Sequence, residues 1–361
     1  MPHARQSEQT KKAVNSSGAI RLHPKAQRLQ FDFPGPFVKL GPSHFLTIDS
    51  RGTLRTRDGG KTWIGQPFFN YAPHDKEYKL SNERVFFRTK AGTVLASFVN
   101  LNEKRWLWRN ELKDALPGNR LPQYVFRSSD AGKTWEEPIF LHDAWTGEVR
   151  SLIQLLTGRL VLSTQMLIHN PGRHGVLTYT SDDDGRTWKP SPLIDLGGSG
   201  HHDGVIEATI AELRDGRVWM LLRTNWGKFW QAFSHDGGRT WREIGPSNID
   251  ASSSPGQLLR LRSGRLMLCW NRYLHTDGRK PVLKGGDGVL CDTPASWQRE
   301  ELSIAFSEDD GKAWSRPVVV ATKADAWLSY PRLLEPCPGE IWITTMQGPV
   351  RLRIAERDFI A

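Results

Sequence analysis

The chain has 361 residues, of which 38% are hydrophobic and 24% charged, with a formal net charge of +10. This composition is typical of a globular protein and excludes collagen-like and low-complexity chains. There is no run of about 18 apolar residues, so we expect no transmembrane helix. Lys and Arg are scattered rather than gathered in runs, which favours an anionic substrate over nucleic acid as partner of this basic chain.

Residues 1–25 are polar and show no periodicity. We predict that they form a disordered or loosely attached arm, followed by a single domain over residues 26–361. The first residues hold no apolar segment of a signal peptide, so we expect either a cytoplasmic protein or one whose leader was removed. Cys269, Cys291 and Cys337 lack the spacing of a disulfide framework or a metal site, and we expect no metal or other cofactor.

An eight-residue pattern, Ser/Thr-x-Asp-x-Gly-x-Thr-Trp, recurs along the chain and is called the Asp box below. It occupies residues 56–63, 128–135, 181–188, 234–241 and 307–314, with Ala313 in place of the Thr in the last copy. The Asp can accept hydrogen bonds from backbone N–H groups, the Gly allows positive φ and the Trp buries a large ring. We interpret the Asp box as a structural turn rather than an active site.

A second repeat is a small turn that contains Gly and leads into an aliphatic strand. Its copies lie at residues 51–54, 91–94, 157–160, 215–218, 263–266 and 338–341. Each is flanked by short apolar runs, the pattern of a β-hairpin. Six hairpins and five Asp boxes give a unit of about 55 residues, which suits a four-stranded propeller blade. The sequence therefore predicts an all-β fold, a six-bladed β-propeller of four-stranded antiparallel blades.

Four blades are expected near residues 80–140, 145–195, 200–250 and 255–320, the last with an insertion at 271–300. The rest of the ring is expected from both chain ends. The runs IWITTM and VRLRIAER would pair near HFLTI and GTLRTRDGGKTW, which removes exposed sheet edges. One helix is expected, in a loop over Glu103–Leu116.

Five Asp boxes with six hairpins resemble the sialidase (neuraminidase) superfamily of six-bladed propellers over about residues 35–355. Further segments strengthen the resemblance. Glu207 is followed about 16 residues later by Arg223, Arg299 precedes the last Asp box, and Tyr330 follows it. These positions are similar to a Glu, two Arg and a Tyr of that family.

The resemblance implies specific roles for these residues. In the family, three Arg bind the substrate carboxylate, a Tyr activated by a Glu attacks the anomeric carbon, and an Asp is the acid/base. Tyr330 would then be the nucleophile, Glu207 its activator, and Arg223 and Arg299 two of the three Arg. A neutral Tyr avoids the repulsion that a carboxylate nucleophile would meet from the substrate carboxylate. Arg binds a carboxylate bidentately.

Two parts of the family pattern are altered. The family's Arg-Ile-Pro motif is replaced by Glu83-Arg84-Val85, so Arg84 is the candidate for the first Arg. No Asp stands clearly at the acid/base position. The candidates there are Glu103, Glu111, Asp114 or a His.

Polar and aromatic residues near expected strand ends are candidates for the substrate-binding mouth. His residues cluster in mid-sequence and can act as acids or bases near neutral pH. Trp226 and Trp230 could stack on a sugar ring. The predicted mouth comprises Arg150, Asn225, Trp226 and the histidines His142, His169, His174, His201 and His202, of which His201 and His202 could replace the missing Asp.

The first functional hypothesis is a retaining exo-glycosidase that removes a terminal acidic sugar, sialic acid or a similar one, from glycans. The second is a propeller lyase or hydrolase that acts on uronate-containing polysaccharide with a His/Tyr pair. The third is a non-catalytic glycan-binding propeller, because one fold hosts many functions.

Overall fold

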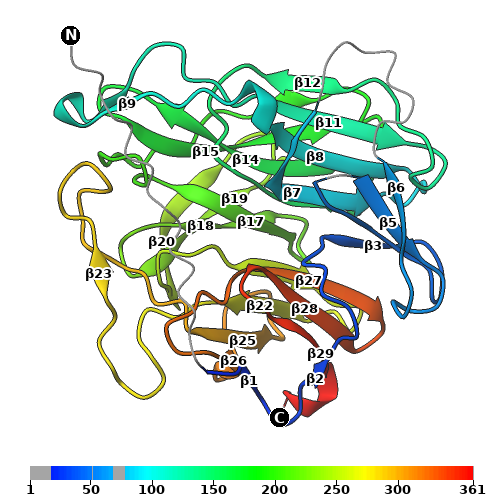
Figure 1. The fold of residues 1–361 in the computed structure, drawn as a ribbon. Helices are drawn as coiled ribbons and strands as arrows, with labels where there is room; N and C mark the ends of the chain where they lie inside the picture. Colours follow the sequence, from blue (N-terminus) through cyan, green and yellow to red (C-terminus); the bar gives the residue numbers. More distant parts are fainter. Residues whose placement is uncertain (1–17, 51, 68–77, 361) are drawn as a thin grey trace.

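The computed structural model describes residues 18–50, 52–67 and 78–360, and it is a six-bladed β-propeller, as predicted (Figure 1). Every blade is an antiparallel sheet. Blade 1 consists of β3 (Phe37–Lys39), β4 (Phe45–Ile48), β5 (Gly52–Thr56) and β6 (Ile64–Pro67). Blade 2 consists of β7 (Leu80–Arg88), β8 (Val94–Asn100), β11 (Gln123–Ser128) and β12 (Ile139–His142). Blade 3 consists of β13 (Val149–Gln154), β14 (Leu160–Ile168), β15 (Arg173–Ser181) and β16 (Lys189–Pro190).

Blades 4 to 6 complete the ring, and each again runs from its inner strand to its outer strand. Blade 4 consists of β17 (Ile206–Glu212), β18 (Val218–Arg223), β19 (Lys228–Ser234) and β20 (Arg242–Asp250). Blade 5 contains β21 (Gln257–Arg260), β22 (Leu266–Trp270), β25 (Glu301–Ser307) and β26 (Val318–Thr322). Blade 6 consists of β27 (Ser329–Cys337), β28 (Glu340–Gln347), β29 (Arg351–Ala355) and β2 (Gln27–Arg28). The first strand of each blade contacts its counterparts in neighbouring blades, so these six strands surround the axis.

The ring closes through the N-terminal strand β2, which pairs with β29 so that Gln27 lies opposite Arg353. The expected pairing of HFLTI and GTLRT with the C-terminal strands is wrong. Those runs are β4 and β5, and with β3 and β6 they form blade 1. The turn between Lys39 and Phe45 adds an inner strand that the sequence reading missed, so residues 37–67 hold a whole blade.

Part of the expected N-terminal arm is built into the propeller. β1 (Arg21–Leu22) pairs with β26 and adds a fifth strand to blade 5. The side chains of Ile20 and Leu22 pack against the core between blades 5 and 6. The loosely attached arm therefore does not extend to these residues, because they bury apolar surface and pair their backbone. Residues 1–17 lie outside the described residues.

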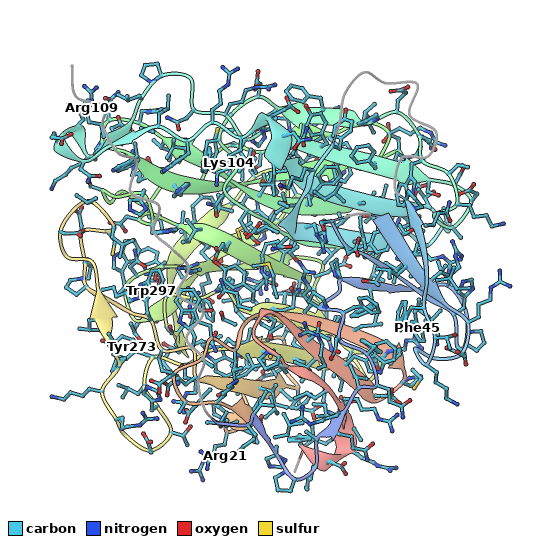
Figure 2. All side chains as sticks on the ribbon, viewed as in Figure 1. Arg21, Phe45, Lys104, Arg109, Tyr273 and Trp297 are labelled. Atoms are coloured by element: carbon cyan, nitrogen blue, oxygen red, sulfur yellow. The ribbon has the colours of Figure 1, made fainter. Side chains whose placement is uncertain are left out.

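The hydrophobic core is divided into six clusters, one between each pair of neighbouring blades. Side chains fill these spaces throughout the molecule (Figure 2). Between blades 6 and 1 the cluster is aromatic, with the Phe45 ring 4.7 Å from that of Trp342. Among residues 18–50, 52–67 and 78–360, no helix is long and apolar enough to span a membrane.

All five Asp boxes connect the third and fourth strands of blades 1 to 5. In the copy at 181–188, Asp183 accepts hydrogen bonds from the backbone N–H groups of Arg186 and Thr187 at 3.0 and 2.9 Å, and one from the Thr187 hydroxyl at 2.6 Å. Burial opposes ionisation, but these bonds lower the pKa of Asp183 to about 2. The Asp box is thus a turn whose polar groups satisfy one another.

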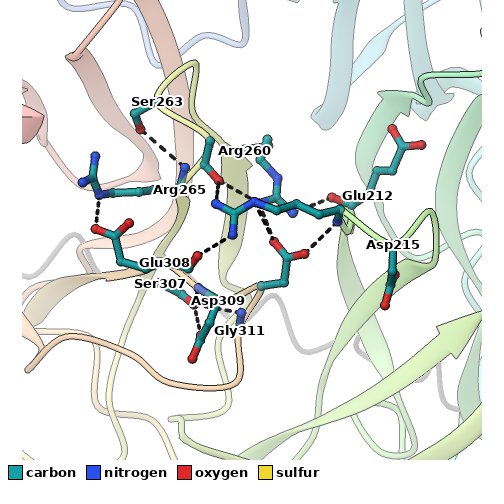
Figure 3. A network of polar contacts seen from close by, with 12 residues as sticks. Glu212, Asp215, Arg260, Ser263, Arg265, Ser307, Glu308, Asp309 and Gly311 are labelled. Atoms are coloured by element: carbon teal, nitrogen blue, oxygen red, sulfur yellow. Dashed lines mark hydrogen bonds and ion pairs between the residues drawn. The ribbon is translucent and has the colours of Figure 1, made fainter.

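The Asp boxes also join neighbouring blades. The box of blade 5 meets the hairpins of blades 4 and 5 in a polar network (Figure 3). There Arg260 donates to Asp310 at 2.6 Å and to the backbone oxygen of Glu212 at 2.7 Å. Apolar contacts do the same elsewhere, because the box Gly of blades 2 to 5 lies against a side chain of the preceding blade. A Cβ on Gly238 of blade 4 would lie 2.7 Å from Val161 of blade 3.

Two loops carry the departures from regular blades. The helix expected over Glu103–Leu116 is wrong. That segment contains the 3₁₀ turns η1 (Leu101–Glu103) and η2 (Asn110–Leu112) and a small hairpin of β9 (Trp108–Arg109) and β10 (Asp114–Ala115). Asn119 bonds both backbone groups of Leu107, and Lys113 has a φ of +48°, which ends a helix. The insertion in blade 5 is confirmed and holds β23 (Leu283–Lys284) and β24 (Ala295–Ser296).

Substitution of Gly238 by Ala should destabilise the propeller more than substitution of Gly216. Both glycines have positive φ, +86° and +84°, but a Cβ on Gly216 meets nothing within 4 Å. Gly216→Ala should cost about 1–2 kcal/mol from backbone strain. Gly238→Ala should add about 1–3 kcal/mol from overpacking against Val161. Urea unfolding measures both, and equal losses would show that the box Gly does not join blades.

Candidate active site

Four residues singled out from the sequence meet at the end of the propeller where its inner strands begin. Glu207 and Tyr330 are the second residues of β17 and β27. Arg223 ends β18, and Arg299 lies just before β25. Blades 4, 5 and 6 therefore bring together side chains that lie as far apart in sequence as the 123 positions between Glu207 and Tyr330.

Glu207 and Tyr330 form a buried hydrogen-bonded pair. The Tyr330 hydroxyl donates to Oε1 of Glu207 at 2.7 Å, and Tyr330 and Glu207 are only 9% and 8% exposed. Both have positive φ, +50° for Glu207 and +60° for Tyr330. For residues other than Gly this conformation costs about 1–3 kcal/mol and clusters at functional sites. The fold holds both residues of the pair in strained conformations.

Arg223 binds the other oxygen of Glu207. Its Nη1 donates to Oε2 of Glu207 and lies 3.4 Å from the Tyr330 hydroxyl oxygen. Its Nε and Nη2 donate to the Ser253 hydroxyl at 3.3 and 2.9 Å. Because Arg223 is as deeply buried as Glu207, the two charges compensate each other away from water.

Arg299 approaches the same tyrosine from blade 5. Its guanidinium carbon lies 5.6 Å from the centre of the Tyr330 ring. Nη2 donates to the backbone oxygen of Ser253 at 2.8 Å, and Nη1 to the side chain of Gln347 at 2.9 Å. Arg223 and Arg299 therefore share Ser253 and place two positive charges beside Tyr330.

The charge states of the pair follow from these contacts. Burial opposes ionisation of Glu207, but Arg223 holds the pKa of this carboxyl below its usual value. Burial, reinforced by the Glu207 charge, raises the pKa of Tyr330. At neutral pH the site therefore presents a carboxylate that accepts a hydrogen bond from a neutral phenol.

The structure does not bring Arg84, the candidate for the first Arg, into this group. None of the described contacts joins Arg84 to Arg223, Arg299 or Tyr330. Its Nη1 donates to the backbone oxygen of Ser81 at 2.8 Å, and its buried Nε has no partner among the described residues. A register shift between β7 and β8 precedes Arg84, and its side chain lines a cavity along the propeller axis.

Arg150, expected at the sugar-binding mouth, lines the same axial cavity. It is buried, and its Nη2 donates to the backbone oxygen of Pro331 at 2.7 Å. Its guanidinium carbon lies 5.4 Å from the centre of the Tyr330 ring. Arg150 therefore contacts Tyr330 from the cavity and does not lie at an exposed rim.

Glu148 is a buried carboxyl that the sequence reading did not select. It is 3% exposed, and its Oε1 has no hydrogen-bond partner among the described residues. Burial, with the nearby Glu83 and Glu207 carboxylates, raises the pKa of Glu148 well above its usual value. Glu148 lies immediately before β13 and two residues from Arg150, and this position was the signal available in the sequence.

Asn225 supports the arginine indirectly. Its Oδ1 accepts a hydrogen bond of 2.7 Å from Ser253, the hydroxyl that Arg223 binds. Its Nδ2 donates to the backbone oxygen of His202 at 2.9 Å. Asn225 thus fixes the Arg223 side chain through Ser253.

No described hydrogen bond joins the aromatic and histidine candidates to the Tyr330 hydroxyl. Trp226 packs edge-on against Trp230, with ring centres 5.0 Å apart. His201 and His202 lie on the loop before β17, with ring centres 4.8 Å apart, and His201 faces Trp108 at 5.6 Å. Neither histidine contacts Tyr330 in any described interaction.

The other three histidines are held by hydrogen bonds to other groups. His142 bonds the hydroxyl of Tyr179 at 2.8 Å, and burial lowers the pKa of His142 to about 4. His169 bonds Asp114, and the buried His174 bonds the backbone oxygen of His201 at 3.1 Å. The described ranges contain no group of three or more His, Cys, Asp or Glu side chains placed to hold a metal ion.

None of the three acidic candidates for the acid/base reaches the Glu207–Tyr330 pair. Glu103 pairs with Arg120 and accepts a hydrogen bond from Tyr124 inside blade 2. Glu111 is exposed in η2, and Asp114 accepts hydrogen bonds from His169 and the backbone of Asn170. Their region of sequence builds the small β9–β10 hairpin and its contacts.

Comparison with known proteins agrees with this architecture. The chain matches the family described as BNR repeat-like domain over residues 47–343, and it belongs to that family. A sialidase of Micromonospora viridifaciens is 26% identical over 275 residues, 72% of this chain and 39% of the relative. A sialidase of Bacteroides fragilis is 25% identical over 286 residues, 73% of this chain and 48% of the relative. The match spans less than half the length of either relative.

Solved structures share the fold at low identity. A Dyadobacter fermentans protein of unknown function has a TM-score of 0.62 and 16% identity, covering 92% of this chain and 100% of its own. The Hadza microbial sialidase Hz136 has a TM-score of 0.61 and 18% identity, covering 91% and 66%. Trypanosoma rangeli sialidase has a TM-score of 0.57 and 14% identity, covering 92% and 59%.

The Glu207–Arg223 pair should show strong energetic coupling. Either Glu207→Gln or Arg223→Met leaves one buried charge without its partner and should cost about 3–5 kcal/mol of unfolding free energy. The double variant should cost clearly less than the sum, which urea unfolding in a double-mutant cycle measures. Asp277→Asn, which removes an exposed partner of Arg279, should leave the unfolding free energy nearly unchanged. Additive losses at the buried pair would contradict the proposed coupling.

Proposed function

We propose that the protein is a retaining exo-glycosidase that hydrolyses a terminal acidic sugar, sialic acid or a similar one, from a glycan. The observation that carries the proposal is the buried Tyr330–Glu207 hydrogen bond of 2.7 Å with Arg223 and Arg299 beside it. The sialidase relatives support the same class of reaction.

In the proposed first step, the substrate carboxylate lies on Arg223 and Arg299, and the Tyr330 oxygen attacks the anomeric carbon. Glu207 takes the phenolic proton as the bond to the leaving oxygen breaks. The substrate carboxylate would also compete for Arg223, which weakens the hold of Arg223 on Glu207 and raises the proton affinity of Glu207. Substrate binding would thus prepare Tyr330 to react.

A second group must give the leaving oxygen its proton, and we assign this role to Glu148. In the first step the Glu148 carboxyl donates its proton to the leaving oxygen. In the second, the Glu148 carboxylate takes a proton from water as the water displaces Tyr330, and the phenol regains its proton from Glu207. Two displacements at one carbon retain its configuration. A buried carboxyl whose pKa is raised well above its usual value suits such an acid.

Tyr330→Phe should lower kcat on the 4-methylumbelliferyl glycoside of sialic acid, or of the acidic sugar that the wild type prefers, by about 10³-fold or more. The substitution removes the attacking oxygen and leaves the ring, so the unfolding free energy should change little. Fluorescence of the released product measures the rate. An unchanged rate would reject the nucleophile. Formation of an unsaturated uronate that absorbs in the ultraviolet would favour the polysaccharide lyase.

Glu148→Gln should separate substrates by their leaving groups. Hydrolysis of a glycan, whose leaving alcohol needs a proton, should slow by about 10²–10⁴-fold. Release of an acidic phenol needs little protonation, so its first step should be nearly unaffected in single-turnover measurements.

The pH dependence gives a second readout for Glu148. The wild-type rate on the glycan should fall as pH rises through the raised pKa of Glu148, because the proton donor is then lost. Glu148→Gln should lose this limb, while Glu111→Gln, at an exposed site, should keep it. Equal slowing of both substrate types would indicate a structural role instead.

A further inference from the structure

A cavity of about 460 Å³ lies along the propeller axis, and the guanidinium carbon of Arg150 in its wall lies 5.4 Å from the centre of the Tyr330 ring. Its walls are the inner strands of every blade except blade 4. It runs from Arg84 and Arg150 toward the hairpin end of these strands, where the lining residues Arg88 and Arg262 are exposed. Its volume lies within the range of about 300–1,000 Å³ of small-molecule sites.

The cavity wall is strongly basic. Its lining contains one Lys, six Arg and a single acidic residue, Glu335. Glu335 accepts hydrogen bonds from the backbone N–H groups of Arg262 and Gly339, so its carboxylate is occupied by the hairpin. Arg260 is paired with Asp310 in the joint between blades. The remaining positive charge faces the cavity.

Three of these arginines, Arg84, Arg150 and Arg332, are buried and make no ion pair with any carboxylate of the described residues. Their described hydrogen bonds go only to backbone oxygens, two of them from Arg332 to Gly35 and Asn82. The buried Nε atoms of Arg84 and Arg150 have no partner at all in the described part of the chain.

Positive charge is crowded in this cluster. Burial, together with Arg84 and Arg150, lowers the pKa of Arg332 well below its usual value, which reports crowded positive charge. Glu148, the carboxyl that acts most strongly on Arg332, is held toward its neutral form by burial. Buried charges without a partner carry a desolvation penalty, which a bound anion would offset.

We propose that this axial cavity is a second binding site, distinct from the Tyr330–Glu207 pair, for a small molecule that carries an oxyanion. The forks of Arg84, Arg150 and Arg332 provide N–H donors for a carboxylate, sulfate or phosphate group. Arg88 and Arg262 at the hairpin end would attract the anion to the cavity from that face of the propeller. The site does not depend on the proposed hydrolysis.

Titration calorimetry of the whole protein shows whether the cavity binds a carboxylate, a sulfate or a phosphate group. The ligands to compare are glucuronate, glucose 6-sulfate, glucose 6-phosphate and inorganic sulfate. Glucose is the uncharged control. At least one anion should bind while glucose does not, and the preferred anion identifies the group. A site for free ions would bind inorganic sulfate as tightly as the sugar sulfate. Absence of binding by every anion would overturn the proposal.

Variants locate the binding. Arg332→Met and Arg84→Met should each weaken the preferred anion about tenfold or more, which is about 1.4 kcal/mol. Arg262→Glu, at the exposed opening, should weaken it severalfold and keeps the fold intact if either buried variant fails to fold. Arg299→Met, at the Tyr330 site, should leave this binding unchanged. Loss in Arg299→Met but not in the cavity variants would place the anion at the Tyr330 site and contradict the proposal.

Discussion

The buried carboxylate of Glu207 determines how the candidate site is arranged. It accepts one hydrogen bond from Tyr330 and pairs with Arg223, so one side chain fixes a nucleophile candidate and a carboxylate-binding Arg at once. A buried charge of this kind requires both partners, because loss of either leaves it uncompensated. The positive φ of Glu207 and of Tyr330 indicates that backbone geometry is strained to keep the pair together.

The propeller supplies the rigidity that this arrangement needs. Glu207, Arg299 and Tyr330 come from three blades, and a shift of one blade against another would separate them. Six apolar clusters and the Asp boxes hold the blades together, and the box Gly of blades 2 to 5 packs against the preceding blade. The Asp boxes lie away from the chemistry, and their contribution to the site is mechanical.

The sequence predicts the repeated blades well, but it predicts poorly which side chains meet around the propeller axis. Asp boxes and hairpins carry local turn chemistry, so the six blades could be predicted from them directly, whereas Glu207, Arg223 and Tyr330 were expected only from the resemblance to sialidases. Glu148 could not be predicted from the sequence, because its proposed acid/base role depends on burial and on neighbours from other blades. Arg84 was expected beside Arg223. The position of an inner-strand side chain along the axis depends on register shifts, such as the one before Arg84, and no motif encodes them. The expected Glu103–Leu116 helix failed because side-chain to backbone bonds overrode local propensity.

The central claim is that Tyr330 becomes covalently bonded to the sugar. The direct test is mass spectrometry of the protein after reaction with a fluorinated acidic glycosyl fluoride, in which the ring fluorine slows hydrolysis of the intermediate. The account predicts that the added glycosyl mass lies on the peptide that contains Tyr330 and is missing in Tyr330→Phe. Labelling of another residue, or turnover that inverts the anomeric configuration with no labelled protein, would contradict it.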